Sequence, residues 1–265
     1  MKKRHLIYVA CLLVAMGACS ATSKERTKIT PDAWGKYNVG TILFEDKAPE
    51  TKGSDIYHRI IPDAESYIKA QAREVLATLY HSPEDSIPTV NKIHYTLEDI
   101  EGVSAKGGGN GDVTIFYSTR HIEKSFAAND TAKLFFETRG VLLHELTHAY
   151  QLEPQGVGSY GTNRVFWAFI EGMADAVRVA NGGFDGPNAR PKGGNYMDGY
   201  RTAGYFFVWL RDNKDPEFLC KFNRSTLEVI PWSFDGAIKH ILGNEYNIDE
   251  LWHEYQVAVG DIQAQ

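Results

Sequence analysis

Cysteine and long apolar runs are scarce in this sequence of 265 residues, and that scarcity limits the choice of fold. Of the three cysteines, Cys11 and Cys19 lie near the amino terminus, so only Cys220 belongs to the body of the chain. A lone cysteine cannot form an intrachain disulfide, and the fold must therefore rest on its hydrophobic core. With 43% hydrophobic residues, the chain can build one large domain or two small ones.

The sequence also lacks an excess of basic residues. Its formal net charge is −6, which gives no sign of a nucleic-acid-binding surface, and no nucleic-acid partner is expected. Internal repeats and low-complexity segments are absent from the sequence as well. The glycine run Gly107–Gly109 does not fit a phosphate loop, because it lies between two strand patterns and lacks a following Lys-Ser or Lys-Thr pair.

The apolar stretch at the amino terminus runs only from Leu6 to Met16, which is too short to span a bilayer comfortably. It follows three basic residues and precedes two small residues and Cys19, the layout of a secretory signal. The ending "MGAC" resembles the lipobox of bacterial lipoproteins, in which the signal is cut before a cysteine that then carries lipid. An ordinary signal peptide with a chance cysteine is the alternative.

We therefore expect residues 1–18 to be a signal peptide and residues 19–33 to be a polar tether that is lipidated at Cys19. Residues 34–265 are expected to form the folded domain. This organisation predicts a lipid anchor to a membrane and a location in the bacterial cell envelope, at the outer membrane or the cell surface.

Hydrophobic periodicity predicts a first half of mixed elements and a second half that is mostly helical. A helix is expected over Ser66–Tyr80, with strands over Val90–Asp99, Gly102–Gly111 and Asp112–Arg120. Further helices are predicted over 131–151 (capped by Asn129 or Asp130), 164–181 and 200–213, and around 233–242 and 247–259. Strands that precede a block of helices favour the α+β class.

The stretch GVLLHELTHAYQ places two imidazoles and a carboxylate inside an apolar helix, where such groups are costly to bury without partners. On a helix, His144 and His148 lie on one face, with Glu145 beside them. This is the H-E-x-x-H arrangement, in which two imidazoles hold Zn²⁺ and the carboxylate serves as general base. Two core histidines with ordinary partners are the alternative, which the apolar setting disfavours.

A catalytic zinc needs a third protein ligand. No further histidine follows His148 closely, so the candidates come from the next predicted helix, where Glu171 and Asp175 are four residues apart. We predict that Glu171 binds the metal and that Asp175 orients His144 through a hydrogen bond, as in the thermolysin-like pattern. The reverse choice, with Asp175 as the ligand, stays open.

Three ordered motifs, HELTHAYQ, EGMADAVRV and GYRTAGYFFVWL, resemble the plant basic secretory proteins and their bacterial relatives, a zincin-like family of peptidases. The resemblance covers most of the chain beyond the tether. It implies a zincin fold, in which a small mixed sheet packs on the H-E-x-x-H helix before a mostly helical second half, and it implies peptidase activity. The chain departs from the family in being acidic, so plant-like wall or defence partners are not implied.

The chemistry predicts a zinc-dependent peptidase that acts on a peptide or protein substrate, with Glu145 moving the proton of the attacking water to the leaving amine. The oxyanion formed on the way needs a hydrogen-bond donor. Tyr200 is the preferred candidate because it belongs to the third motif, while Tyr160, Tyr205 and His240 stay open.

Two other functions are compatible with the same residues. A non-catalytic surface lipoprotein could keep zinc while it binds glycan or peptide, and the same site could hydrolyse a non-peptide amide or ester. Glu145 favours catalysis, because a structural metal site has no use for a carboxylate beside its first histidine. The strand over 102–109 is either a sheet edge that pairs with an extended substrate or a plain hairpin arm, and a monomer is expected.

Overall fold

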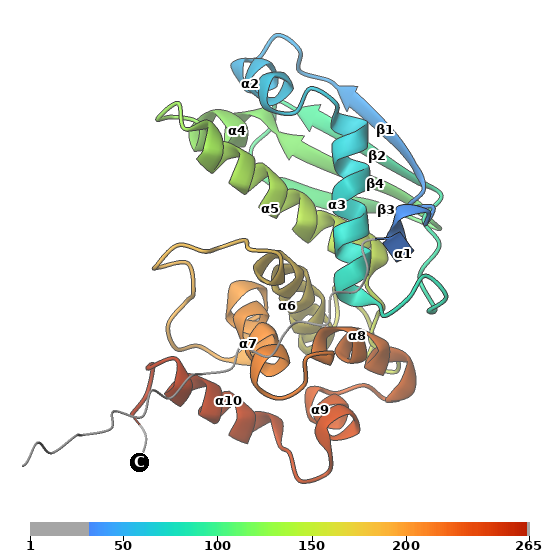
Figure 1. Cartoon of the computed structure of the whole chain (residues 1–265), viewed down its shortest axis with the longest axis vertical. Helices are drawn as coiled ribbons and strands as arrows, with labels where there is room; N and C mark the ends of the chain where they lie inside the picture. Colours follow the sequence, from blue (N-terminus) through green and yellow to red (C-terminus); the bar gives the residue numbers. More distant parts are fainter. Residues whose placement is uncertain (1–31, 264–265) are drawn as a thin grey trace, which may run out of the picture.

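The first half of the chain builds one small mixed sheet (Figure 1). The computed structural model describes residues 32–263, and within them the strand order is β1-β2-β4-β3. β1 and β4 both lie parallel to β2, whereas β3 is antiparallel to β4 and forms an edge of the sheet. The strands are β1 (Thr41–Asp46), β2 (Lys92–Glu98), β3 (Ser104–Gly109) and β4 (Asp112–Ser118).

Helices accompany the sheet and then make up the second half of the chain. Those of the first half are α1 (Asp32–Gly35), α2 (Lys52–Ile60), α3 (Ala64–Leu79), α4 (Thr119–Ser125) and α5 (Thr131–Tyr150). The second half contains α6 (Arg164–Ala180), the 3-10 turn η1 (Tyr196–Asp198), α7 (Tyr200–Asn213), α8 (Phe218–Glu228), α9 (Phe234–Leu242) and α10 (Ile248–Ala258). The predicted α+β class with a small mixed sheet is confirmed.

One face of the sheet is covered by α3 and α5 (Figure 1). Side chains alternate along β2, where Ile93, Tyr95 and Leu97 are buried and His94 is partly exposed on the other face. Tyr57 of α2 packs on Tyr95, with their ring centres 6.4 Å apart. This alternation is typical of a strand with one packed face. The apolar side chains all point to one side of the sheet, and α5 lies on that side.

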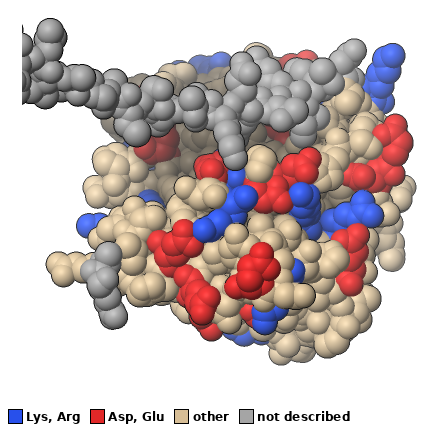
Figure 2. Space-filling view, turned by 60° about the horizontal axis from the view of Figure 1, so that its bottom comes forward, with Lys and Arg blue, Asp and Glu red and all other residues tan. Residues whose placement is uncertain are grey.

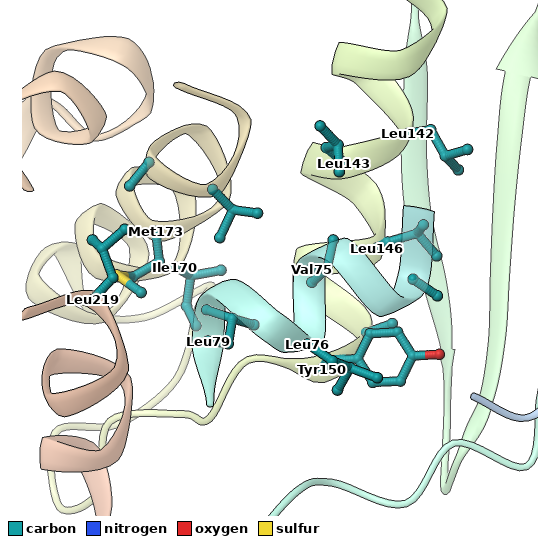
Figure 3. Packing of buried hydrophobic residues seen from close by; sticks show 14 of the residues in the cluster. Val75, Leu76, Leu79, Leu142, Leu143, Leu146, Tyr150, Ile170, Met173 and Leu219 are labelled. Atoms are coloured by element: carbon teal, nitrogen blue, oxygen red, sulfur yellow. The ribbon is translucent and has the colours of Figure 1, made fainter. Parts of the chain in front are cut away.

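A shared core joins the two halves of the chain where α3, α5, α6 and α8 meet (Figure 3). The buried Tyr80 hydroxyl, just after α3, donates to the backbone oxygen of Tyr150 at 2.5 Å. Each fully buried apolar side chain contributes about 1.5–3 kcal/mol, so this core holds α5 firmly against α6. Its labelled members are Val75, Leu76, Leu79, Leu142, Leu143, Leu146, Tyr150, Ile170, Met173 and Leu219.

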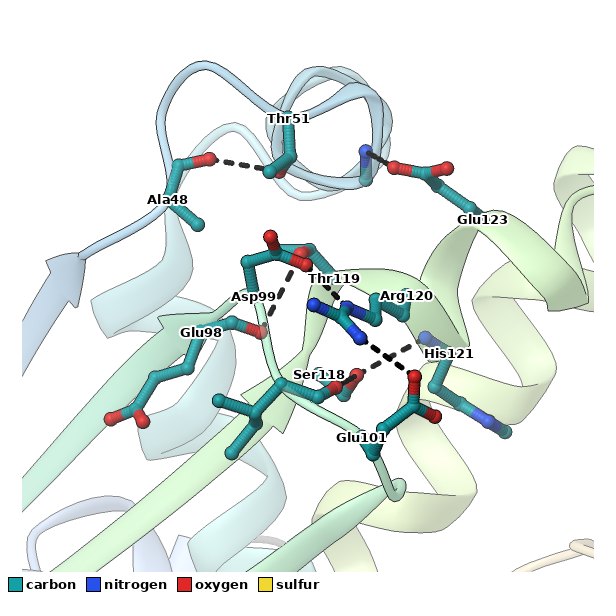
Figure 4. Close-up of polar contacts among 12 residues, drawn as sticks. Ala48, Thr51, Glu98, Asp99, Glu101, Ser118, Thr119, Arg120, His121 and Glu123 are labelled. Carbon is teal, nitrogen blue, oxygen red and sulfur yellow. Dashed lines mark hydrogen bonds and ion pairs between the residues drawn. The ribbon is translucent and has the colours of Figure 1, made fainter.

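Polar contacts secure the loop that leads into the edge strand (Figure 4). Arg120 of α4 donates to Asp99 and to Glu101, both at 2.6 Å. The Ser118 hydroxyl caps α4 by accepting from the backbone N–H of His121 at 3.2 Å. These ion pairs are exposed and contribute little to stability, so we assign them the role of directing the chain into β3.

Several predicted elements are confirmed. The helix expected over Ser66–Tyr80 is α3, and the expected hairpin joins β3 to β4, with Gly107–Gly109 at the end of β3 and Asn110 and Gly111 in the turn. Of the two candidate caps, Asp130 caps α5, and its carboxylate accepts from the backbone N–H of Lys133 at 2.9 Å. β1, α1, α2, α4 and α8 were not predicted; β1, α1 and α4, with four to seven residues each, carry few repeats of an apolar period.

The predicted signal segment 1–18 and Cys19 lie outside the described residues, as does the tether apart from its last two residues, which begin α1. Within residues 32–263, no helix combines the length and the apolar character needed to cross a membrane. On the face turned forward in Figure 2, acidic and basic side chains are intermixed.

Candidate metal centre

The carboxyl-terminal half of α5 carries His144, Glu145 and His148, and α6 carries Glu171 and Asp175. Both pairs have a spacing of four residues, which places the members of each pair on one face of their helix. α5 and α6 pack against each other, so the two faces meet. All five residues are buried or nearly so, and Glu171 and Asp175 are each only 4% exposed.

Three ligand atoms converge between the two helices. The Nε2 atoms of His144 and His148 lie 3.1 Å apart. Glu171 Oε2 is 3.3 Å from the first of these atoms and 3.7 Å from the second. The structure thus brings together the three residues predicted as metal ligands, with their donor atoms all within 4.8 Å of one another.

Asp175 and Glu171 contact opposite nitrogens of the His144 ring. Asp175 Oδ1 is 2.7 Å from Nδ1 of His144, so Nδ1 donates the hydrogen bond and Nε2 is the nitrogen that faces Glu171. Burial opposes the charged form of His144, but the neighbouring carboxylates of Asp175 and Glu171 outweigh it and raise the pKa of the imidazole to about 10, so a bound metal would displace a proton from Nε2. In this geometry Asp175 orients the ring, and Glu171 faces the metal position.

Gln151 contacts Nδ1 of His148 as Asp175 contacts Nδ1 of His144, and the sequence did not predict this contact. Its side-chain amide is 2.8 Å from Nδ1 of His148, and its Oε1 is buried with no hydrogen-bond partner among residues 32–263. A half-turn of the amide places Oε1 on Nδ1–H and leaves Nε2 of His148 as a lone-pair donor. The position of Gln151, three residues after His148, was the available signal.

A divalent cation fits these donors. Glu171 Oε2 is buried without a hydrogen-bond partner among the described residues and is aimed at two imidazole nitrogens. A buried carboxylate oxygen in that state is costly unless something positive satisfies it. Two imidazoles and one carboxylate are also a donor set that zinc accepts, with a fourth position left open.

A cleft of about 920 Å³ opens over the three ligand residues and is also lined by Glu145 and by Ser104 and Lys106 of the edge strand. Burial raises the pKa of the Glu145 carboxyl above its ordinary value, which suits a group that must take up and release a proton. A substrate in this cleft would run beside the exposed edge of β3.

Two of the four proposed oxyanion donors line the cleft, namely Tyr160 and Tyr200. The Tyr160 hydroxyl already donates to Glu171 Oε1 at 2.6 Å. The Tyr200 ring is stacked 6.0 Å from the ring of His144. Both tyrosines are nearly half exposed, so they stand between the ligands and the solvent.

The other two candidates lie elsewhere. The Tyr205 hydroxyl donates to the backbone oxygen of Phe184, and His240 pairs with Glu228 at 3.0 Å. Neither Tyr205 nor His240 lines the cleft, so the structure leaves Tyr160 and Tyr200 as the candidates.

Close packing of α7 on α6 places Tyr200 at the cleft. A Cβ on Gly204 would lie 2.9 Å from the backbone nitrogen of Ala176, so only glycine permits this approach. Tyr200 begins α7 with a φ of +41°, a conformation that is uncommon for a residue with a side chain. Its ring contacts that of Trp167 edge-on at 5.4 Å, which helps to hold it over His144.

The family model described as "Peptidase of plants and bacteria", that of the basic secretory protein family, matches residues 40–255. The chain belongs to this family. The match contains all three motifs that carried the resemblance, and with them the five residues of the site. Neither the curated proteins nor the solved structures gave a match.

The roles of the two carboxylates on α6 predict different losses of metal affinity. Glu171→Ala removes a ligand and should weaken zinc binding most, whereas Asp175→Asn should weaken it by about 10–100-fold because the His144 ring loses its orientation. Competition against a chromogenic chelator measures both constants. Glu153→Gln, which changes an exposed carboxylate in the cleft wall, should bind zinc like the wild type. If Asp175→Asn lost more zinc affinity than Glu171→Ala, Asp175 would be the metal ligand and Glu171 the orienting residue.

Proposed function

We propose that this protein is a zinc-dependent peptidase of the H-E-x-x-H, thermolysin-like type, with a zincin-like arrangement of its sheet and α5. One observation carries the proposal. The donor atoms of His144, His148 and Glu171 lie within 4.8 Å of one another at the floor of a large cleft, with Glu145 beside them. Membership of a peptidase family supports it.

A bound Zn²⁺ would polarise the scissile carbonyl and acidify the attacking water. Glu145 takes the proton from that water and passes it to the leaving amine, for which its raised pKa is suited. His144 and His148 are held in position by Asp175 and Gln151 and supply the two nitrogen ligands. The edge strand offers unpaired backbone groups to an extended peptide.

The location of the protein belongs to the same proposal. The signal-like start and Cys19 support a lipid anchor in the bacterial cell envelope, at the outer membrane or the cell surface. We propose that the anchored enzyme acts as a monomer. Mass spectrometry of the processed amino terminus tests the anchor, because an unmodified Cys19 would contradict it.

Glu145→Gln should abolish cleavage while it keeps the metal. The amide has the shape of the carboxylate but cannot accept the proton of the attacking water, and a general base contributes typically 10²–10⁴-fold. Digestion of an unfolded protein by the zinc-loaded enzyme measures the loss, with Glu153→Gln as the matched control. Equal cleavage by wild type and Glu145→Gln, or zinc binding without any cleavage by the wild type, would favour the non-catalytic binding protein.

Tyr200→Phe should lower kcat by about 10²-fold or more and leave KM nearly unchanged, because an oxyanion donor acts mainly in the transition state. The matched variant is Tyr160→Phe, which removes a hydroxyl that is already engaged by Glu171. Steady-state kinetics on one peptide substrate compares the two. If only Tyr160→Phe lost much of its kcat, Tyr160 would be the oxyanion donor.

A further inference from the structure

One end of the cleft is basic and aromatic. Arg178 of α6, Phe184 of the following loop and Arg201 of α7 all line it. The guanidinium carbon of Arg178 lies 3.8 Å from the centre of the Phe184 ring, and that of Arg201 lies 5.3 Å from it. A guanidinium that lies over a ring keeps its N–H donors free at its edge, so this cluster can stack and still bind an anion.

Arg178 is built into the wall of the cleft. It is only 6% exposed, and its guanidinium donates to Glu137 at 2.6 Å. Its Nε occupies the space above Gly140, where a Cβ would lie 2.3 Å away, so glycine at this position on α5 makes room for the guanidinium. The same Nε is buried and has no hydrogen-bond partner within residues 32–263.

Arg201 is exposed on the first turn of α7 and donates to the backbone oxygen of Ala189 at 3.1 Å. None of the ion pairs in the described part of the chain includes it. Arg178 is neutralised by Glu137, whereas the charge of Arg201 faces the cleft without a compensating carboxylate. An anionic ligand would satisfy it.

The basic cluster lies at the right distance to contact a substrate residue near the bond that is cleaved. Glu171, Asp175 and Arg178 follow one another at i, i+4 and i+7 on the face of α6 that meets the cleft. Seven residues of helix rise about 10 Å from Glu171 to Arg178. An extended peptide advances about 3.3 Å per residue, so a side chain within two or three residues of the scissile bond reaches the cluster.

We infer that Arg178, Phe184 and Arg201 form a subsite for the carboxylate of an aspartate or glutamate side chain in the substrate. The inference rests on the proposed peptidase function and names its specificity. The cleft, at about 920 Å³, continues past the ligands to Ser104 and Lys106 of the edge strand, and the proposal commits to a substrate side chain rather than to a free carboxyl terminus. That continuation accommodates a chain that passes through.

Matched peptides that carry glutamate, glutamine or lysine at each position around one cleavage site test the subsite on the zinc-loaded protein. At one of these positions the wild type should cleave the glutamate peptide with a kcat/KM at least about tenfold above the glutamine peptide, since charge-assisted hydrogen bonds are the stronger ones. Arg201→Gln should lower that ratio to near one. Arg201→Glu should reverse it in favour of lysine.

Two control variants distinguish an effect of this cluster from an effect of the protein's overall charge. Lys106→Gln removes an equal charge elsewhere in the cleft, and Arg224→Gln removes one from an exposed ion pair on α8, so both should keep the glutamate preference. A wild type that cleaves without this preference, an Arg201→Gln variant that keeps it, or an equal loss in Lys106→Gln overturns the subsite. Cleavage that requires a free terminal carboxylate overturns it as well.

Binding gives a readout that does not depend on turnover. Fluorescence anisotropy with the zinc-loaded Glu145→Gln variant should show tighter binding of the glutamate peptide than of the glutamine peptide, and Arg201→Gln in that background should remove the difference. Absence of cleavage in the wild type together with this binding difference would reject the peptidase function and keep the anion subsite. Cleavage without any such binding difference would do the opposite.

Discussion

The hydrogen bond between Asp175 Oδ1 and His144 Nδ1, 2.7 Å long, joins the two helices on which the site depends. It fixes the His144 ring, determines which nitrogen faces the cavity, and defines which carboxylate of α6 is left for a metal. The bond forms only if α5 and α6 pack at one particular register. The shared apolar core of α3, α5, α6 and α8 supplies that register, so stability and site geometry have the same origin.

Hydrogen bonds hold the metal-ligand side chains in place. Asp175 and Gln151 contact the two imidazoles from behind, and Tyr160 donates to one oxygen of Glu171. Glu171 Oε2, which faces both imidazole nitrogens, has no hydrogen-bond partner among residues 32–263. A cation at that point would compensate the cost of burying these groups in an otherwise apolar interface. Arg178, two turns after Glu171 on α6, and Arg201, on the first turn of α7, then give the cleft its basic end.

Local pattern predicted most of the site. Helical spacing was enough to place His144 and His148 together, and to pair Glu171 with Asp175, because four-residue spacing survives in any helix. It could not decide which α6 carboxylate faces the metal, because that depends on how α5 packs on α6. Nor could it decide which tyrosines reach the cleft, because that depends on how α6 and α7 cross at Gly204. Arg178 was missed for the same reason, because its place in the wall depends on packing against Gly140. β1, with six residues, was not predicted because so short a strand shows few alternations.

The central claim is that one metal ion sits between α5 and α6. A crystal of the zinc-loaded protein, measured on both sides of the zinc absorption edge, tests it directly. One anomalous peak is predicted about 2.0–2.2 Å from the Nε2 atoms of His144 and His148 and from the carboxylate of Glu171, with Asp175 bound only to His144. A peak that Asp175 coordinates in place of Glu171, or no peak between these helices, would contradict the account.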